Sequence, residues 1–428
     1  MVERKIEIKE ITKIEGHANL TIEIEDDRVK RVAFGIHEGL RHFETLIIGK
    51  RYHYLPELTS RICGICNVAH QIASVRAVED ALGIEVSEQV KDLRKLMLIS
   101  SHIQSHILHL YFLALPDYIG VESAIELARK DIKLVKKAFR LKEACNYMTA
   151  LIGGRAVHPC TILPGGFSKR ITKGMIDRYL KKMREIYPLL LESAELFLSL
   201  DYPSYERESE YVALRDGRGI PLYEGKIATM HAVFDAHEYG EHIKERIVDY
   251  STAKRSLIDG RDFMVGALAR LNINGKLRED ARELANRFGI RFPSNRVAWI
   301  NPAQALENVH YAMEAMEIAE NLKEYEPEKI EVPRTDGKGI AAIEAPRGLL
   351  IHHYVIEKGK CRYANIITPT AMNAENIERS LEGYARKIVD KDDGFIRKEA
   401  EKVIRAYDPC VSCSVHVMRI GTQTIKPA

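Results

Sequence analysis

The sequence lacks the signals of secreted, membrane-spanning and nucleotide-binding proteins. Its first residues contain no apolar signal core, and no later hydrophobic run is long enough to cross a bilayer. Neither of the common phosphate-binding patterns, G-x-G-x-x-G and G-x-x-x-x-G-K-[ST], is present. Acidic and basic residues are interleaved and leave a net charge of only +3, so no basic tract marks a nucleic-acid surface. We therefore expect a cytoplasmic protein with no membrane span and no nucleic-acid partner.

Cysteine is also scarce, and its odd count argues against a disulfide framework. Seven cysteines occur in 428 residues, which is typical of a reduced compartment. Three of them, Cys145, Cys160 and Cys361, are isolated in the sequence. The other four form two C-x-x-C pairs near opposite ends of the chain, and these pairs are the main chemical signal.

Each C-x-x-C pair is closely followed by a histidine, and together the pairs offer four soft ligands. The candidate residues are Cys63, Cys66, Cys410 and Cys413, followed by His70 and His416. Four thiolates suit zinc, an iron–sulfur cluster or another thiophilic transition metal. A local zinc ribbon spaces its pairs by only about 15–20 residues, whereas pairs this far apart require the whole chain to fold around them. We therefore predict one domain, residues 1–428, around a buried metal cofactor.

Hydrophobic periodicity predicts a mainly α fold with β-hairpins at its periphery. Helical spacing predicts long helices over residues 66–82, 87–115, 121–152, 171–200, 302–324 and 395–407. Alternation predicts strands over residues 18–25, 29–36, 340–345, 349–357 and 360–367. Between them, residues 205–300 are typical of short strands and polar loops. The first cysteine pair stands at a predicted helix N-terminus, where the dipole and the free N–H groups favour the thiolate.

Three histidines, His102, His106 and His109, share one face of the predicted helix over residues 87–115. This spacing is compatible with zinc, but no further ligand motif accompanies it, and a zinc site needs a full ligand set. We interpret the three as buried core histidines.

The sequences around both cysteine pairs resemble the large subunit of nickel–iron hydrogenases. The two motifs are R-I-C-G-I-C-x-x-x-H at residues 61–70 and D-P-C-x-x-C-x-x-H at residues 408–416. Shorter matches are I-E-G at Glu15, G-L-R-H-F-E ending at Glu44, G-G-R-x-x-H-P at 153–159, E-A-P-R-G at Arg347 and T-P-T-A-M-N at Thr370. The strings look most like cytoplasmic, reversible enzymes such as sulfhydrogenases and methyl-viologen-reducing hydrogenases. The resemblance implies their multihelical large-subunit fold.

The resemblance also implies the cofactor, a nickel–iron centre whose iron carries cyanide and carbonyl ligands. Cys63 and Cys410 would bind nickel terminally. Cys66 and Cys413 would bridge nickel to the iron, and each bridging thiolate would hold both metals.

Further site residues follow from the same resemblance. His70 would hydrogen-bond a bridging sulfur. Arg347 and Thr370 would hydrogen-bond the two cyanides, and Asp408 would complete the preorganised shell with Arg347. A separate magnesium or iron ion near the C-terminus would be bound by Glu44 and His416.

The implied activity is the reversible heterolytic cleavage of dihydrogen. Cys410 would take the proton, and Glu15 would carry it away. The electrons would leave through a partner, because three isolated cysteines are too few for a four-cysteine iron–sulfur cluster. The expected partners are a hydrogenase small subunit with iron–sulfur clusters and further flavin or iron–sulfur subunits. Because these partners bind the acceptor, nicotinamide, deazaflavin, ferredoxin, sulfur and disulfide all stay open.

Residues 417–428 follow His416 and resemble the short extension that family members commonly lose once nickel is loaded. We expect them to be a maturation peptide, and the alternative is a permanent tail that packs as an extra strand.

Other functions compete with a hydrogenase. Four cysteines also fit a non-catalytic zinc protein and an iron–sulfur electron carrier. The quinone-site subunit of respiratory complex I shares the resembled fold but lacks the four cysteines. Metal analysis separates a zinc protein from a hydrogenase, because the first would hold one zinc and the second nickel and iron.

Overall fold

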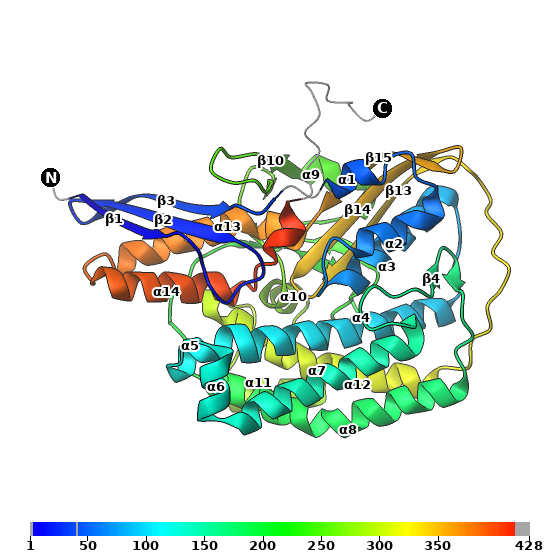
Figure 1. The fold of residues 1–428 in the computed structure, drawn as a ribbon, viewed down its shortest axis with the longest axis horizontal. Coiled ribbons are helices and arrows are strands. Elements are labelled where there is room, and N and C mark those ends of the chain that lie inside the picture. The colour runs from blue at the N-terminus through cyan, green and yellow to red at the C-terminus, as the bar shows by residue number, and fades with distance from the viewer. Residues whose placement is uncertain (1–2, 40–41, 416–428) are drawn as a thin grey trace.

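A layer of long helices forms the lower half of the molecule in Figure 1, a computed structural model that describes residues 3–39 and 42–415. Its members are α4 (Glu88–Leu108), α7 (Ile132–Gly153), α8 (Lys173–Leu198), α11 (Glu279–Arg287) and α12 (Ile300–Asn321). Helix α8 shows why they pack, since Ile176, Tyr179, Met183, Ile186 and Leu190 are buried at intervals of three or four residues. Such an apolar stripe must be covered by neighbouring helices. The predicted mainly α class is thus confirmed.

Two predicted helix boundaries were wrong. The helix that begins with α4 does not stop before Pro116 but continues through a π-helical turn (His109–Ala114) and α5 (Leu115–Ile119). Pro116 lies in the first turn of α5, where its missing N–H is tolerated. The single helix predicted over residues 121–152 is divided into α6 (Ala124–Lys130) and α7. Asp131 divides them because its backbone is extended and its side chain accepts from the N–H groups of Lys133 and Leu134.

An antiparallel sheet and helix α3 (Asn67–Leu82) lie above this layer. The sheet has the order β13 (Gly337–Ala345), β14 (Gly348–Glu357) and β15 (Lys360–Ile367), as predicted. Strand β13 runs directly along α3, and a Cβ atom at Gly339 would stand only 2.0 Å from the carbonyl oxygen of Ala77. Glycine at this position therefore lets the sheet hold α3, and the first cysteine pair with it, at close range.

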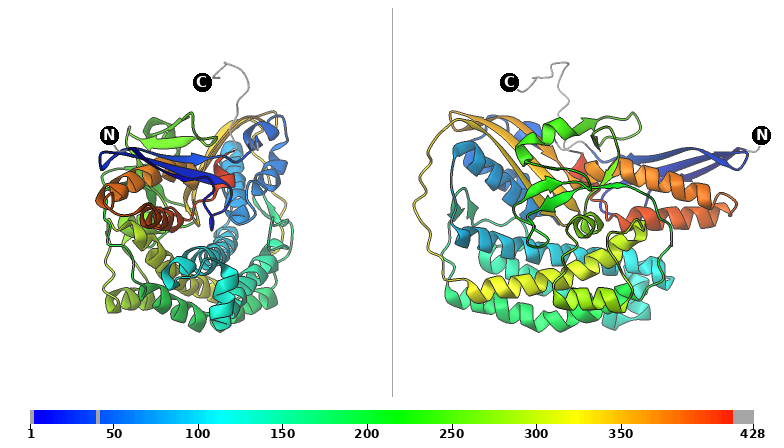
Figure 2. Two further views of the ribbon diagram at one scale, coloured as in Figure 1. Left: turned by 60° about the vertical axis from the view of Figure 1, so that its left-hand side comes forward. Right: turned by 180° about the vertical axis from the view of Figure 1, so that it is seen from behind.

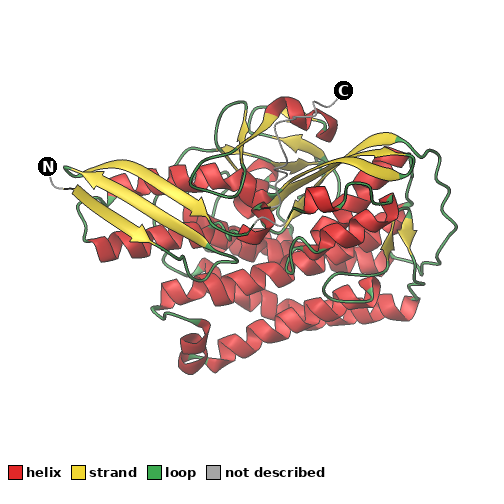
Figure 3. Cartoon of the chain, turned by 45° about the horizontal axis from the view of Figure 1, so that its top comes forward, coloured by secondary structure: helices red, strands yellow, loops and turns green. Residues whose placement is uncertain are grey.

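A second sheet covers the two helices that lead to the C-terminal cysteine pair. It contains β1 (Glu3–Ile8), β2 (Ala18–Glu25) and β3 (Arg28–Ile36) in that order. It lies against α13 (Pro369–Lys387) and α14 (Asp393–Ala406), at the left of Figure 1 and in yellow in Figure 3. The hairpin of β2 and β3 was predicted from alternation, which appears as alternating burial along β2.

Residues 205–300 form short strands, as predicted, and also three α-helices that were not predicted, α9, α10 and α11. Seen from behind in Figure 2, the strands of this stretch lie beside the β13–β14–β15 sheet, with which Val212, Leu214 and Ile227 share a buried cluster. The short elements of the whole chain are α1 (Phe43–Leu46), α2 (Leu55–Ser60), β4 (Ile162–Leu163), β5 (Gly166–Phe167), β6 (Glu210–Tyr211), β7 (Ala213–Arg215), β8 (Lys226–Ala228), β9 (Val233–Phe234), α9 (Tyr239–His242), β10 (Ile243–Arg246), β11 (Arg255–Ile258), β12 (Phe263–Met264) and α10 (Ala267–Asn274). Within the described ranges, no helix is long and apolar enough to span a membrane.

Candidate metal centre

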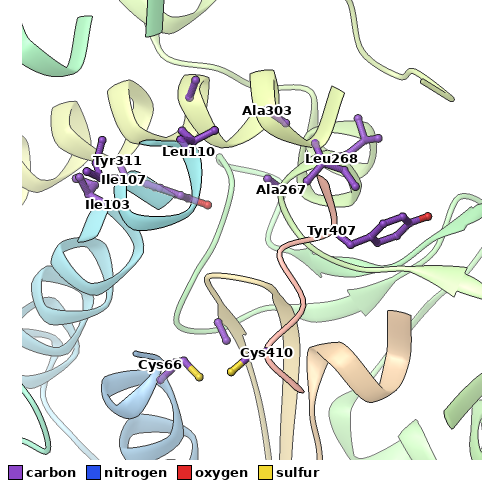
Figure 4. Close-up of a cluster of buried hydrophobic side chains, with 14 of the residues drawn as sticks. Cys66, Ile103, Ile107, Leu110, Ala267, Leu268, Ala303, Tyr311, Tyr407 and Cys410 are labelled. Carbon is purple, nitrogen blue, oxygen red and sulfur yellow. The ribbon is translucent and has the colours of Figure 1, made fainter. Parts of the chain in front are cut away.

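The four predicted cysteine ligands meet although they come from opposite ends of the chain. Their Sγ atoms all lie within 4.8 Å of one another, and all four residues are buried. The Sγ–Sγ distance is 3.4 Å for Cys63 and Cys410 and 3.3 Å for Cys66 and Cys413, well beyond the roughly 2.05 Å of a disulfide. Figure 4 shows the sulfurs of Cys66 and Cys410 facing each other below a group of buried apolar side chains. Four free thiol groups therefore converge on one point.

The first pair is organised by the start of helix α3. Cys66 is the residue before its first turn, and the N–H groups of Ile65 and Cys66 donate to Sγ of Cys63 at 3.3 and 3.2 Å. Hydrogen bonds from the other sulfurs, that of Cys410 foremost, lower the pKa of the Cys63 thiol. Burial raises the pKa of the Cys413 thiol. A bound cation is the ordinary way to keep several buried sulfurs deprotonated together.

The second pair follows a sharp change of chain direction after α14. Asp408 has a φ of 50°, a conformation that is uncommon for residues other than glycine and recurs at functional sites. Cys410 then precedes a short 3-10 turn, Val411–Ser414, which contains Cys413. Thr370, at the start of α13, accepts a hydrogen bond from the N–H of Cys410 at 2.9 Å. The bend at Asp408 and the hydrogen bond to Thr370 thus fix the start of the turn.

Glu15 contacts the second cysteine pair directly. Its backbone pairs with that of Cys410, and its carbonyl accepts from the N–H of Val411 at 3.0 Å. Its carboxylate accepts from the N–H of Ser412 at 3.0 Å and also from the Ser412 hydroxyl. Glu15 is half-buried, and its carboxylate is hydrogen-bonded to the residue between Cys410 and Cys413. Ser412 was not predicted, and its only signal in the sequence is its position inside the second C-x-x-C.

Arg347 and Asp408 form a buried pair beside the sulfurs. Nε of Arg347 donates to the carbonyl of Asp408 at 2.7 Å and Nη2 to its carboxylate at 2.9 Å, while Nη1 lies 3.4 Å from Oγ of Ser105. Burial lowers the pKa of Arg347, but Asp408 and the charges of three nearby cysteines raise it well above its usual value.

Two polar positions in this pair point to a further group beside the sulfurs. Three of the five N–H groups of Arg347 are used, and the other two have no acceptor in residues 3–39 and 42–415. Oδ2 of Asp408 is also buried without a partner in the same ranges. Buried polar atoms are normally satisfied, so the two remaining N–H groups of Arg347 fit a cofactor that carries hydrogen-bond acceptors, while Oδ2 of Asp408 can accept from a further donor.

His70 is held by a buried chain of side chains. Its Nδ1 lies 3.1 Å from Nε2 of His352, whose Nδ1 lies 2.6 Å from the hydroxyl of Tyr354. Tyr354 in turn donates to Ser74 at 3.1 Å. Neither His352 nor Tyr354 was predicted, although alternation along β14 places both on the same face of the sheet.

The predicted second metal site is only half described. Oε1 of Glu44 accepts from the N–H of Ile366 at 2.9 Å, and Oε2 lies 3.6 Å from Nζ of Lys254. His416 and residues 417–428 lie outside the described residues. The magnesium or iron ion therefore stays a prediction.

The three histidines of α4 and its π-helical extension lie in the helical core. Nε2 of His106 contacts the carbonyl of Pro346 at 3.2 Å, and Nε2 of His109 contacts that of Arg405 at 2.7 Å. Burial lowers the pKa of His102 to about 3. Among the described residues, the four cysteines are the one group of histidine, cysteine and acidic side chains that converges as metal ligands do, which agrees with their interpretation as core histidines.

Comparison with known proteins gives a consistent result. The chain matches the family model for nickel-dependent hydrogenase over residues 41–140 and 223–416. It is 36% identical over 421 residues to sulfhydrogenase 1 subunit alpha of Pyrococcus furiosus, covering 97% of this chain and 98% of the relative. It is 30% identical over 434 residues to coenzyme F420 hydrogenase subunit alpha of Methanothermobacter thermautotrophicus, covering 98% and 96%.

Solved structures share the fold. An NAD+-reducing [NiFe]-hydrogenase in the H2-reduced state superposes with a TM-score of 0.86 at 24% identity, covering 96% of this chain and 99% of that one. The H2-activated [NiFeSe]-hydrogenase of Dm. baculatum superposes with a TM-score of 0.78 at 21% identity, covering 97% and 100%.

Proposed function

The chain belongs to the nickel-dependent hydrogenase family, and we propose that its four clustered cysteines hold the nickel–iron centre. It is the catalytic subunit of a nickel–iron hydrogenase, which cleaves dihydrogen reversibly into protons and electrons. The observation that carries the assignment of the centre is the convergence of four buried Sγ atoms within 4.8 Å. Hydrogenase is favoured over the zinc-protein and complex I alternatives because the relatives named above are hydrogenase subunits.

Each cysteine has a proposed role. Cys63 and Cys410 would hold nickel as terminal ligands, and Cys66 and Cys413 would be shared between nickel and iron. The sulfurs are close enough for these roles, with Sγ–Sγ distances of 3.4 Å between Cys63 and Cys410, 3.3 Å between Cys66 and Cys413 and 2.7 Å between Cys410 and Cys413. When bound, the metal pair supplies the open coordination position at which the H–H bond is broken.

The residues around the sulfurs hold the diatomic ligands of the iron in this proposal. Arg347 donates its two remaining N–H groups to one cyanide, and its charge is fixed because guanidinium does not deprotonate. The Thr370 hydroxyl accepts from Cys410 and keeps its own proton to donate to the other cyanide. Asp408 orients Arg347 through two hydrogen bonds. His70 hydrogen-bonds a bridging sulfur.

Glu15 carries the proton away from the centre. Cys410 takes the proton released from dihydrogen, and the Glu15 carboxylate receives it because it lies on the adjacent backbone pairing and reaches toward the surface. Ser412 donates twice to this carboxylate and so fixes its position.

Electron transfer requires partner subunits that carry redox cofactors. We propose a small subunit with iron–sulfur clusters and further flavin or iron–sulfur subunits, in the cytoplasm. Two relatives, in sulfhydrogenase 1 and coenzyme F420 hydrogenase, are alpha subunits, which supports this arrangement.

Two proposals concern the C-terminus. Glu44 and His416 bind a magnesium or iron ion, and residues 417–428 are a maturation peptide removed after His416. The remaining chain is one domain, which agrees with the meeting of cysteines from its two ends.

Serine substitution at the bridging cysteines tests the assignment of the centre. Cys66→Ser and Cys413→Ser should each abolish nickel binding and dihydrogen-dependent dye reduction by the purified complex, because each removed thiolate contacts both metals. Cys145→Ser is the matched control, since Cys145 is equally buried but isolated from the cluster. Wild-type activity in Cys66→Ser would contradict the proposal.

A further inference from the structure

A buried arginine outside the metal centre uses all five of its N–H groups. Arg270, on α10, donates through Nε and Nη2 to the carboxylate of Glu307 at 2.6 and 2.7 Å, and through Nη1 to Glu344 at 3.0 Å. The two remaining N–H groups donate to the carbonyls of Ala345 and Pro346, both at 3.1 Å. Arg270 thus joins α10, α12 and β13 at one point.

The two carbonyls that Arg270 binds belong to the turn that presents Arg347. This turn connects β13 to β14 and contains residues 345–348. Nε2 of His106 contacts the same Pro346 carbonyl at 3.2 Å and lies 3.8 Å from Glu307. A hairpin turn of this length makes few backbone hydrogen bonds of its own. The side-chain hydrogen bonds from Arg270 and His106 therefore fix its position.

The segment before α10 presses on the same turn. Gly348 has a φ of 133°, and a Cβ atom there would stand 2.7 Å from the backbone nitrogen of Gly266. The segment is itself clamped to α13, because Asn373 accepts from the N–H of Val265 at 2.9 Å and donates to its carbonyl at 3.2 Å. The turn is therefore wedged between fixed elements.

In this cluster one guanidinium group faces two carboxyl groups, away from solvent. Arg270, Glu307 and Glu344 are all fully buried. Burial raises the pKa of Glu344 to about 7, and Arg270 opposes that shift. Arg347 has the contrasting pattern, with two N–H groups unused by the described residues. Arg270 thus uses all its N–H donors within the protein, while Arg347 keeps two N–H donors for the metal centre.

We propose that Arg270, supported by His106, is a positioning residue that sets the direction in which Arg347 approaches the iron ligands. This inference rests on the proposed function, in which Arg347 hydrogen-bonds a cyanide. It gives residues 265–270 a part in positioning the centre, although they lie far from the four clustered cysteines in the sequence.

The test compares two buried arginines in the purified, nickel-loaded complex. Arg270→Lys keeps the positive charge but loses the fork that reaches both carbonyls. Arg94→Lys is the matched control, because Arg94 is equally buried and forms a bidentate pair with Glu79 but does not contact residues 345–348. The first readout is the infrared stretching frequency of the iron-bound cyanides. The second is the separation of kcat from KM for dihydrogen oxidation.

Arg270→Lys should shift a cyanide band and lower kcat roughly tenfold to a hundredfold, with the KM for dihydrogen unchanged, because misplacing a catalytic group by about 1 Å has effects of this size. Arg94→Lys should leave the bands in place. Unshifted bands in nickel-loaded Arg270→Lys would overturn the inference, as would an equal shift in both variants. A wild-type enzyme with no cyanide bands would overturn the proposed cofactor, and this inference with it.

A second substitution decides the question if Arg270→Lys does not yield loaded protein. His106→Leu removes one donor to Pro346 and leaves the Arg270 ion pairs intact. Its control is His310→Leu, since His310 is also buried but accepts from the N–H of Arg278 instead. A shifted band in His106→Leu alone supports the inference, and identical spectra in both histidine variants would refute it.

Discussion

Glu15 lies at the boundary between the buried sulfurs and the protein surface. Its carboxylate is half-buried, and Ser412 holds it by a backbone and a side-chain hydrogen bond. A carboxyl group in such a place can exchange protons with both sides, whereas a purely structural glutamate needs only its hydrogen bonds. Glutamine keeps most of those bonds and removes the proton transfer.

Glu15→Gln should therefore lower hydrogen–deuterium exchange about a hundredfold or more while nickel remains bound, which is the usual contribution of a general acid–base group. Isotope exchange measured by mass spectrometry checks this directly. Glu10→Gln is the matched control, because Glu10 lies on the same segment but is exposed, and it should exchange at the wild-type rate. Wild-type exchange in Glu15→Gln would reduce Glu15 to a structural role.

The residue scale also shows which site residues could be predicted. The four cysteines could be predicted from their type and spacing, whereas Arg347 and Thr370 were predicted from the family resemblance of the contiguous motifs that contain them. Arg270 was missed because its partners Glu307 and Glu344 come from distant elements. Such a residue has no local signal, and only the folded chain brings its partners together.

At the scale of elements, α4, α7 and α8 were predictable because one apolar stripe repeats along each of them, whereas α11 has too short a repeat to stand out from the loops around it. Helix α13 was not predictable, because much of its buried face is polar. Glu375 and Glu378 are satisfied there by Arg255, at 2.9 Å in both cases. Ion pairs with a segment more than a hundred residues away replace apolar contacts and hide the helical period.

The break before α7 gives a prediction at this scale. Asp131→Ala removes the two hydrogen bonds that begin α7, and losing such a cap costs about 1 kcal/mol. Amide hydrogen exchange in the first turn of α7 should therefore become about fivefold faster. Hydrogen exchange with mass spectrometry is the measurement.

The control uses the next long helix. Thr172 occupies the same position before α8 but makes no side-chain capping bond. Thr172→Ala should leave exchange in the first turn of α8 unchanged. Equal acceleration in both helices would show that the Asp131 bonds do not begin α7.

At the scale of the whole molecule, the metal centre closes the chain. The first pair stands on α3 and the second follows α14, yet all four sulfurs lie within 4.8 Å. This meeting could be predicted from the chemistry of the ligands alone, because the two thiolates at each end do not complete a metal site by themselves. The helical layer, the two sheets and the hydrogen bonds of Arg270 to the β13–β14 turn then hold the two cysteine pairs in one place.

The metal content of the purified complex tests the central claim most directly. Elemental analysis should find one nickel for each copy of this chain and no zinc bound to it, and nickel should be absent when Cys66 is replaced by serine. Zinc in a one-to-one ratio with the chain, without nickel, would contradict the account.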